Sequence, residues 1–345
     1  MTRVLPPATE RTILVTGGAG YIGSHTAVAL LERGFKVVIA DNFANSSPLA
    51  IEAISKLTDR AVTFVEVDLT DAAATQALIE AHPIDAVIHF AGLKSVGESV
   101  EQPLRYYRTN LLSTMNLLDA MAANDIFELV FSSSATVYGD PETVPIPETA
   151  STGATNPYGR TKLMIEEICR DLSAADSRWR ITLLRYFNPV GAHPSGDLGE
   201  DPNGVPNNLV PFVMQVAVGR RPEVRVFGTD YDTIDGTGVR DYIHVIDLAL
   251  GHVAALSRLD DGTKTYNLGT GTGASVLEVI RAAGAASGVV VPYTVTDRRP
   301  GDIAVSLADP TLANTELGWR ADRGLEVMLR DAWRWQSRHP NGFAN

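Results

Sequence analysis

The sequence predicts an α/β fold in which a parallel, doubly wound sheet is followed by a smaller mixed α/β domain. Three observations support this prediction. Apolar runs of strand length alternate with helical patterns over the first half of the chain, a glycine-rich turn joins the first run to an apolar helix, and loops rich in Gly, Pro and Asn begin near residue 189. Such alternation is typical of strands joined by crossover helices, which lie parallel in one sheet.

Six apolar runs are expected to form the strands of this sheet. In chain order they are Thr12–Thr16, Lys36–Ala40, Thr63–Val67, Asp85–Phe90, Glu128–Phe131 and Arg180–Tyr186. We expect residues 1–188 to form the larger domain and residues 189–345 the smaller one, with some segments of the second part returning to the first.

Composition excludes several classes of protein. The 345 residues include one cysteine and no cluster of Cys and His, so we expect neither a disulfide nor a metal site, and a cytoplasmic location fits best. No apolar run is long enough to cross a membrane. The 29 Lys+Arg against 41 Asp+Glu give a net charge of −12, which disfavours nucleic-acid binding but not a small anionic ligand.

The glycine-rich turn has the pattern of a dinucleotide-binding site. Gly17, Gly20 and Gly23 directly follow the first predicted strand and open the next helix, where backbone N–H groups can approach a pyrophosphate. Asp41 ends the second strand, where a carboxylate accepts hydrogen bonds from ribose hydroxyls and repels a 2′-phosphate, so NAD is expected rather than NADP. Asp68, after the third strand, either lies near the adenine or is an ordinary turn residue.

Ser134, Tyr158 and Lys162 form a candidate catalytic set. Tyr158 and Lys162 are four residues apart and so share one face of a helix. An adjacent ammonium and a positive nicotinamide favour the phenolate of a tyrosine, so Tyr158 is predicted to act as a base with its pKa lowered by Lys162. Lys162 would also hold the nicotinamide ribose, and Ser134, at the end of a strand, would bind the substrate oxygen.

Seven ordered segments resemble one family. They are residues 17–26, 89–94, 131–138, 185–189, 206–209, 238–245 and 298–302. The chain is similar through them to the extended short-chain dehydrogenase/reductases with a Rossmann-type sheet, and within these to the UDP-glucose (UDP-galactose) 4-epimerases. The resemblance implies interconversion of UDP-galactose and UDP-glucose through a transient 4-keto sugar, with tightly bound NAD regenerated in each cycle. It also implies that the smaller domain binds the nucleotide sugar and that two helices pair across a homodimer.

The resemblance adds further site residues. NAD contacts are expected from Tyr21, Ile22, Asn42, Asn45, Ser46, Leu69, Phe90, Ala91, Lys94, Ser132 and Phe187, beside Tyr158 and Lys162. Substrate contacts are expected from Lys94, Ser134, Tyr158, Asn188, Asn207, Asn208, Leu209, Phe227, Arg240, Tyr242, Arg299, Asp302 and Ser306. Arg240 and Arg299 suit a diphosphate because a guanidinium donates two hydrogen bonds, and surface ion pairs with Asp241 and Asp302 are the alternative.

Two other functions share part of this pattern. Nucleotide-sugar dehydratases and decarboxylating relatives use the same turn and Tyr–Lys pair, but they need an acid soon after the active-site Ser or Thr. Here Ser134 is followed by Ala135, Thr136 and Val137. The side chains of Ala135 and Val137 cannot exchange a proton, and the Thr136 hydroxyl is a poor acid. A non-catalytic NAD-binding scaffold is the second alternative, and the intact set of three catalytic residues argues against it.

Two segments bear on substrate range and access. Family members restricted to glucose and galactose often carry tyrosine at the ninth position counted from Arg298, where this chain has Ser306. The smaller side chain predicts that UDP-GlcNAc and UDP-GalNAc are also interconverted. Residues 135–156 show little periodicity and either cover the site or make a passive surface excursion.

Overall fold

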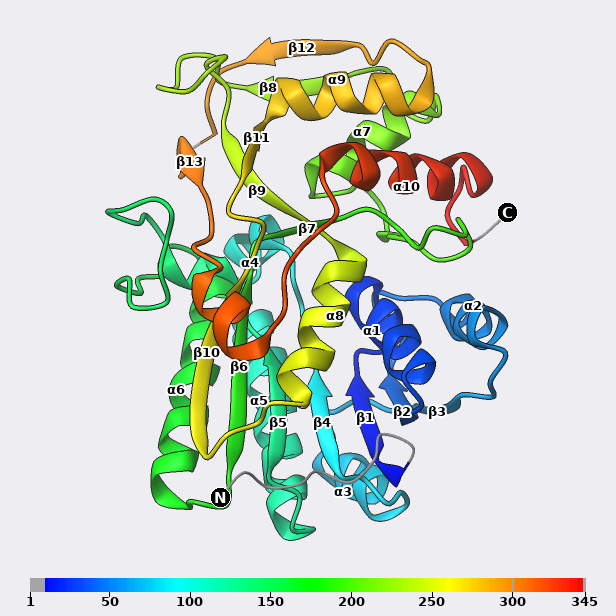
Figure 1. Cartoon of the computed structure of the whole chain (residues 1–345), viewed down its shortest axis with the longest axis vertical. Helices are drawn as coiled ribbons and strands as arrows, with labels where there is room; N and C mark the ends of the chain where they lie inside the picture. Colours follow the sequence, from blue (N-terminus) through cyan, green and yellow to red (C-terminus); the bar gives the residue numbers. More distant parts are fainter. Residues whose placement is uncertain (1–9, 300, 344–345) are drawn as a thin grey trace. The chain divides into compact units, whose positions relative to one another are not determined.

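Parallel strands form the centre of the first half of the chain, as the alternating pattern predicts. The computed structural model describes residues 10–299 and 301–343 (Figure 1). Residues 1–9, 300 and 344–345, which fall within the two predicted domains, lie outside this description. Within the described residues, seven strands form one sheet in the order β10-β6-β5-β4-β1-β2-β3. Their bounds are β1 (Thr12–Thr16), β2 (Lys36–Asp41), β3 (Thr63–Glu66), β4 (Ala86–His89), β5 (Glu128–Ser132), β6 (Arg180–Tyr186) and β10 (Gly262–Leu268).

The strand order confirms the predicted doubly wound fold. β1 pairs in parallel with both β2 and β4, and the chain then continues outward in opposite directions from these neighbours. The order of the sheet therefore reverses between β1 and β4, and in such sheets ligands bind at the carboxyl ends of the strands beside that point. β10 was not expected in this sheet, because its sequence lies far from that of its neighbour β6.

Helices connect successive strands and pack in two groups. They are α1 (Tyr21–Glu32), α2 (Pro48–Thr58), α3 (Ala72–Glu80), α4 (Val96–Glu101), α5 (Pro103–Ala123) and α6 (Pro157–Ala175), with a short 3₁₀ turn η2 (Ala135–Tyr138). α1 packs on α2, whereas α3 packs on α5 and α5 on α6. Because crossover connections are right-handed, this grouping covers the two faces of the sheet.

Helix starts follow local sequence signals. Ser47 and Asp71 cap α2 and α3 with side-chain oxygens that accept a backbone N–H, and proline occupies the first position of α2. The same signals begin α6, where Asn156 accepts from the N–H of Gly159 (2.8 Å) and Pro157 follows. α6 therefore starts one residue before Tyr158, which fixes the position of the predicted catalytic tyrosine.

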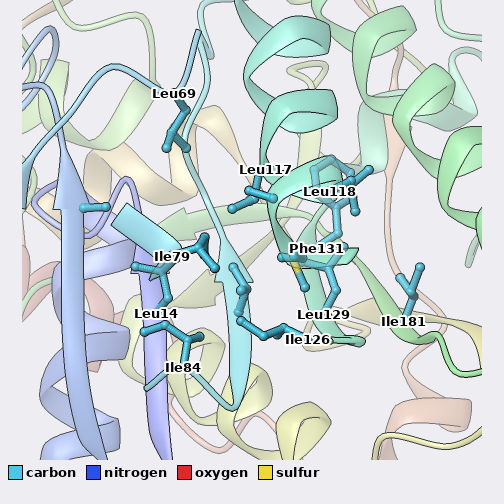
Figure 2. Packing of buried hydrophobic residues seen from close by; sticks show 14 of the residues in the cluster. Leu14, Leu69, Ile79, Ile84, Leu117, Leu118, Ile126, Leu129, Phe131 and Ile181 are labelled. Carbon is cyan, nitrogen blue, oxygen red and sulfur yellow. The ribbon is translucent and has the colours of Figure 1, made fainter. Parts of the chain in front are cut away.

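The sheet and its helices enclose an apolar core. Figure 2 shows Leu117 and Leu118 of α5 with Leu129 and Phe131 of β5 in this cluster, together with Leu14 of β1. All five are at most 4% exposed. Each such side chain contributes about 1.5–3 kcal/mol by leaving water, so the strand ends that carry the site are rigidly supported.

The chain divides into two compact units. Among the described residues, the first contains 10–139, 152–185 and 249–266, and the second contains 140–151, 186–248, 267–299 and 301–343. The assignment of cofactor and nucleotide-sugar binding to the predicted domains 1–188 and 189–345 stays a prediction.

The second unit is built around smaller sheets. β9 (Val239–His244) pairs with β7 (Asn188–Val190), β11 (Gly273–Ser275) and β13 (Val305–Ser306), and β8 (Val224–Phe227) pairs with β12 (Tyr293–Thr296). The remaining elements are α7 (Leu209–Ala217), α8 (Val245–Leu256), which begins in this unit, α9 (Val276–Ser287), a π-helical turn η3 (Ala313–Leu317) and α10 (Leu325–Arg338). α7, α9 and α10 pack on one another around a separate apolar core. Over the described part of the chain, no helix combines the length and apolar character needed to span a bilayer.

Candidate functional site

The turn between β1 and α1 is closely packed against its neighbours. Gly17 has φ +66°, and a Cβ there would lie 2.7 Å from the backbone N of Ala91. A Cβ on Gly23 would lie 2.3 Å from the carbonyl oxygen of Gly17. Glycine is therefore required at both positions, as the motif predicts. The Gly20 N-cap gives α1 no side-chain cap, so its first N–H groups are suited to a pyrophosphate.

Asp41 is fixed beside this turn. One carboxylate oxygen accepts from the N–H of Ala19 (3.0 Å), and the other accepts from the N–H of Phe43 (2.9 Å) and the hydroxyl of Ser46 (2.8 Å). These bonds hold an anionic acceptor at the end of β2, where a ribose hydroxyl can donate to it and a 2′-phosphate would be repelled. The glycine cradle and this carboxylate fit NAD.

Asp68 forms the hydrogen bonds of an ordinary turn residue, and its expected place near the adenine stays a prediction. Its carboxylate accepts from the N–H (2.9 Å) and hydroxyl (2.7 Å) of Thr70, as in an ordinary turn, and these bonds lower its pKa. It also bonds the side chain of Asn42, so the loops after β2 and β3 meet among expected cofactor residues. The side chain of the following residue, Leu69, is buried in the core, which leaves only its backbone to face a ligand.

The predicted catalytic side chains come together at the ends of β5 and α6. Ser134 follows β5, and its hydroxyl is hydrogen-bonded to the phenol of Tyr158. Lys162 lies one turn further along α6, and its Nζ donates to the carbonyl oxygen of Ser132 (2.7 Å) and lies 6.0 Å from the Tyr158 ring centroid. All three side chains are at most 8% exposed. The fold therefore brings the three predicted side chains together, and their catalytic roles stay a prediction.

Burial dominates the acid–base properties of this set. It raises the pKa of Tyr158 to about 12, and the hydrogen bond to Ser134 opposes that rise. Burial also lowers the pKa of Lys162 to about 8, and the charge of Glu166 opposes that fall. The predicted lowering of the Tyr158 pKa is not met, because desolvation of the buried phenolate raises that pKa.

Other expected cofactor residues of the first unit lie at the ends of the central strands. Phe90 and Ala91 follow β4, and the Phe90 ring packs on His252 with centroids 4.7 Å apart. Lys94 follows in the same loop, which Asn110 holds by accepting from the N–H of Leu93 (2.8 Å) and donating to its carbonyl oxygen (3.1 Å). These positions surround the reversal point between β1 and β4.

Four of the expected substrate residues of the second unit, Asn188, Arg240, Tyr242 and Ser306, lie on β9 or on strands that pair with it. Asn188 donates to the carbonyl oxygen of Asp241 (2.9 Å), and Ser306 of β13 pairs with Arg240 of β9. Tyr242 is buried, which raises its pKa to about 12, and the charge of Arg240 opposes that rise. Asn208 is the N-cap of α7, and Leu209 is the first residue of that helix.

The two arginines differ in their partners. Arg240 donates to the backbone carbonyls of Val239 (2.9 Å) and Ala304 (3.4 Å), whereas the Asp241 carboxylate binds elsewhere, so the ion pair considered between them does not form. Arg299 does pair with Asp302 (2.9 Å) and stacks 4.7 Å from the Phe227 ring centroid, with a half-exposed side chain. Both guanidinium groups are held in place by partners within their own unit.

Residues 140–151 are held by defined hydrogen bonds. Ile146 donates its N–H to Leu307 O (2.8 Å) and accepts from the N–H of Asp309 (2.9 Å) and from the amide of Asn267 (2.8 Å). This part of the long aperiodic segment is therefore joined by backbone bonds to the residues directly after Ser306. That residues 135–156 cover the site stays a prediction.

Comparison with known proteins identifies the family. The family model described as "NAD dependent epimerase/dehydratase family" matches residues 13–269. The chain belongs to this family. A UDP-glucose 4-epimerase of Bacillus subtilis (strain 168) is 59% identical over 333 residues, which are 96% of this chain and 98% of the relative.

Solved structures of similar proteins agree with the predicted fold and the predicted cofactor. A UDP-glucose 4-epimerase from Bifidobacterium longum in complex with NAD⁺ and UDP has a TM-score of 0.93 and 54% identity, covering 96% of this chain and 100% of that one. A UDP-Glc/GlcNAc 4-epimerase from Campylobacter jejuni has a TM-score of 0.84 and 38% identity, covering 95% and 99%. The prediction of an NAD-dependent epimerase of the extended short-chain dehydrogenase/reductase family is confirmed.

Two buried polar residues near the site are not among the predicted site residues. Asn110 donates to the hydroxyl of Thr161 (3.0 Å) besides holding the Lys94 loop, and Glu166 lies fully buried one turn after Lys162. The four-residue spacing from Lys162 to Glu166 was a visible signal for the second. The partners of Asn110 are distant in sequence, so local spacing could not show that it holds the Lys94 loop.

Proposed function

We propose that this chain is a UDP-glucose 4-epimerase that interconverts UDP-galactose and UDP-glucose through a transient 4-keto sugar. The observation that carries the proposal is the hydrogen-bonded, buried set of Ser134, Tyr158 and Lys162 at the strand ends beside the glycine turn. The relatives named above carry this activity in their names.

The chain's own residues divide the work of the reaction. Bound NAD⁺ supplies a hydride acceptor at the sugar C4 that later returns the hydride, so there is no net oxidation. The phenol oxygen of Tyr158 takes the proton from the sugar O4, and the Ser134 hydroxyl donates a hydrogen bond to that oxygen. Lys162 holds the nicotinamide ribose and favours the phenolate by its charge.

Inversion requires a firm hold on the nucleotide and a loose hold on the hexose. Arg240 and Arg299 supply forked donors for the diphosphate. The 4-keto sugar turns about its bonds to the diphosphate and presents its other face to the cofactor. Tyr158 then returns its proton to O4 and is ready for the next cycle.

The residues after Ser134 favour epimerisation over dehydration. The Thr136 hydroxyl donates to Ser134 (2.9 Å), and Val137 is buried without a titratable group. Elimination across C5 and C6 needs a proton donor and acceptor that these residues do not supply.

Turnover by the purified protein tests the proposal. We expect conversion of UDP-galactose to UDP-glucose in a coupled assay, and a rise of reduced-nicotinamide absorbance on mixing with UDP-galactose without added NAD. The proposal fails if the folded, NAD-containing protein turns over no UDP-hexose, a result that would favour the scaffold.

We expect the N-acetylated pair, UDP-GlcNAc and UDP-GalNAc, to be substrates as well. Ser306 is a small, half-buried residue paired with Arg240, and the Campylobacter jejuni relative is named for both glucose and N-acetylglucosamine substrates. The Ser306→Tyr variant should lose at least about tenfold in kcat/KM for UDP-GalNAc and keep its activity on UDP-galactose, because the phenol would fill the space of the acetyl group. Ser306→Ala is the matched control and should keep both activities. Full N-acetyl activity in Ser306→Tyr would contradict the assignment.

A homodimer formed through α5 and α6 is also part of the proposal. These helices pack together and expose Leu104, Leu112, Met115 and Met164. Leu118 of α5 and Ile165 of α6 are instead buried in the core. The exposed residues are of the kind that a second copy of the chain would cover. A cytoplasmic location is proposed on the single cysteine and the absence of a predicted apolar span.

A further inference from the structure

Glu166 is a buried carboxylate next to the candidate catalytic set. It lies one helical turn after Lys162 on α6, and its side chain is 0% exposed. The proton transfers described above do not use it. Because an unpaired buried charge costs several kcal/mol, its partners must explain its presence.

Four donors occupy the Glu166 carboxylate. Arg185 of β6 donates from Nε to one oxygen (2.9 Å) and from Nη2 to the other (2.6 Å). The Ser133 hydroxyl (2.6 Å) and Arg170 (2.8 Å) complete the set. Burial alone would raise the pKa of Glu166, but the bonds and charge of Arg185, with the bonds from Ser133 and Arg170, hold it below its usual value. Glu166 is therefore a carboxylate anion.

The bond to Ser133 links Glu166 to the active residues. Ser133 lies between Ser132, whose carbonyl oxygen accepts from Lys162 Nζ, and Ser134, whose hydroxyl binds Tyr158. The Glu166 carboxylate thus holds Ser133, and the residues on either side of Ser133 contact Lys162 and Tyr158.

Glu166 also acts on Lys162 by its charge. The groups that face Lys162 are Tyr158 and Glu166 on α6, His89 on β4, and the uncharged Phe131 ring and Ser132 carbonyl on β5. Burial and Lys162 lower the pKa of His89 to about 3, so this imidazole is neutral and adds no second positive charge beside the ammonium. Tyr158 is neutral up to a pKa of about 12. Arg185 on β6 reduces the effect of Glu166 without reversing it, since Glu166 still raises the Lys162 pKa.

We propose that Glu166 is a positioning residue that keeps Lys162 protonated and holds the Ser132–Ser134 segment in place for the reaction. This inference rests on the proposed epimerase function, in which the ammonium of Lys162 favours the Tyr158 phenolate. Glu166 touches neither sugar nor cofactor in this role.

The pH dependence of the NAD-loaded enzyme tests the charge effect. Activity that needs the Lys162 ammonium is lost as pH rises through the Lys162 pKa, about 8. Glu166→Gln keeps the shape but removes the charge, so the alkaline limb of kcat should move to lower pH by about one unit. Glu166→Asp keeps the charge but is too short for all four bonds, so its rate should fall while the limb stays in place. A purely structural role predicts lower rates for both variants with neither limb displaced, and that result overturns the proposal.

A second measurement does not depend on turnover. Reductive methylation of Lys162, followed by peptide mass spectrometry, increases with the fraction of neutral amine and reports its pKa directly. Its midpoint should fall by about one pH unit in Glu166→Gln. If the wild-type chain turns over no UDP-sugar but this shift occurs, the proposed function fails while the coupling of Glu166 to Lys162 stands. An unshifted midpoint in folded Glu166→Gln overturns the inference even when the wild type is active.

Arg170→Glu decides the question if Glu166→Gln does not fold. Arg170 is 41% exposed, so its replacement is tolerated, and a new negative charge beside Glu166 should raise the methylation midpoint of Lys162 by about half a pH unit. A rise supports the proposal. No change, or a fall, overturns it.

Discussion

Replacing Tyr158 with phenylalanine is expected to lower kcat for UDP-galactose by about 10²- to 10⁴-fold, because it removes the proposed proton acceptor. The ring stays in its pocket, since Tyr158 is 7% exposed and only the hydroxyl is lost. KM should therefore change little. The loss of one hydrogen bond to Ser134 should reduce the free energy of unfolding by about 1 kcal/mol. Steady-state kinetics and thermal unfolding measure both effects.

Tyr231→Phe is the matched control for this variant. Tyr231 is also 7% exposed, and within the described residues its hydroxyl has no hydrogen-bond partner. Phenylalanine keeps the ring on which Arg298 stacks (3.9 Å), so activity and stability should stay close to those of the wild type. If Tyr158→Phe retains a rate within tenfold of the control, Tyr158 is not the base.

The residues predicted from the sequence share one property, which is that their placement depends on local signals. The turn at Gly17–Gly23 is specified by a strand, glycines and a helix within one short segment. Tyr158 and Lys162 are placed by helix periodicity once Asn156 and Pro157 begin α6. Chemistry that depends on one turn or one helix can be recognised in this way, because neighbours in sequence are neighbours in space.

The residues that sequence analysis missed depend on distant partners. The buried charge of Glu166 is explained by its hydrogen bonds with Ser133 and Arg185, which are 33 and 19 residues away in the sequence. Likewise β10 belongs to the main sheet although most of a second unit separates it from β6. Periodicity can show that such a carboxylate or strand faces inward, but only the assembled fold shows what it meets there.

The prediction that the pKa of Tyr158 is lowered was wrong for a related reason, since burial also depends on the assembled fold. Spacing places an ammonium beside the phenol, and charge alone would lower the pKa of that phenol. Burial has the opposite effect and is stronger, raising the pKa to about 12. In the proposed mechanism, the charges of Lys162 and of the bound nicotinamide together have to offset this effect of burial.

Gly23→Ala is expected to weaken NAD binding by about 10²-fold, because it displaces the donors of the glycine turn by about 1 Å. The added Cβ would lie 2.3 Å from Gly17 O and 2.8 Å from Gly18 Cα, and backbone atoms cannot rotate away as a side chain can. Helix α1 must then move off the turn, and the N–H groups at its start move with it.

The NAD content of the purified variant and its dissociation constant from titration calorimetry measure this effect. Gly324→Ala is the matched control, since a Cβ there meets nothing within 4 Å and the residue lies in the second unit. It should bind NAD like the wild type. Overpacking should also cost Gly23→Ala about 1–3 kcal/mol in the free energy of unfolding, so binding is compared at a temperature where both variants are folded. Wild-type NAD affinity in Gly23→Ala would mean that the turn tolerates separation from α1, and that the helix start does not hold the pyrophosphate.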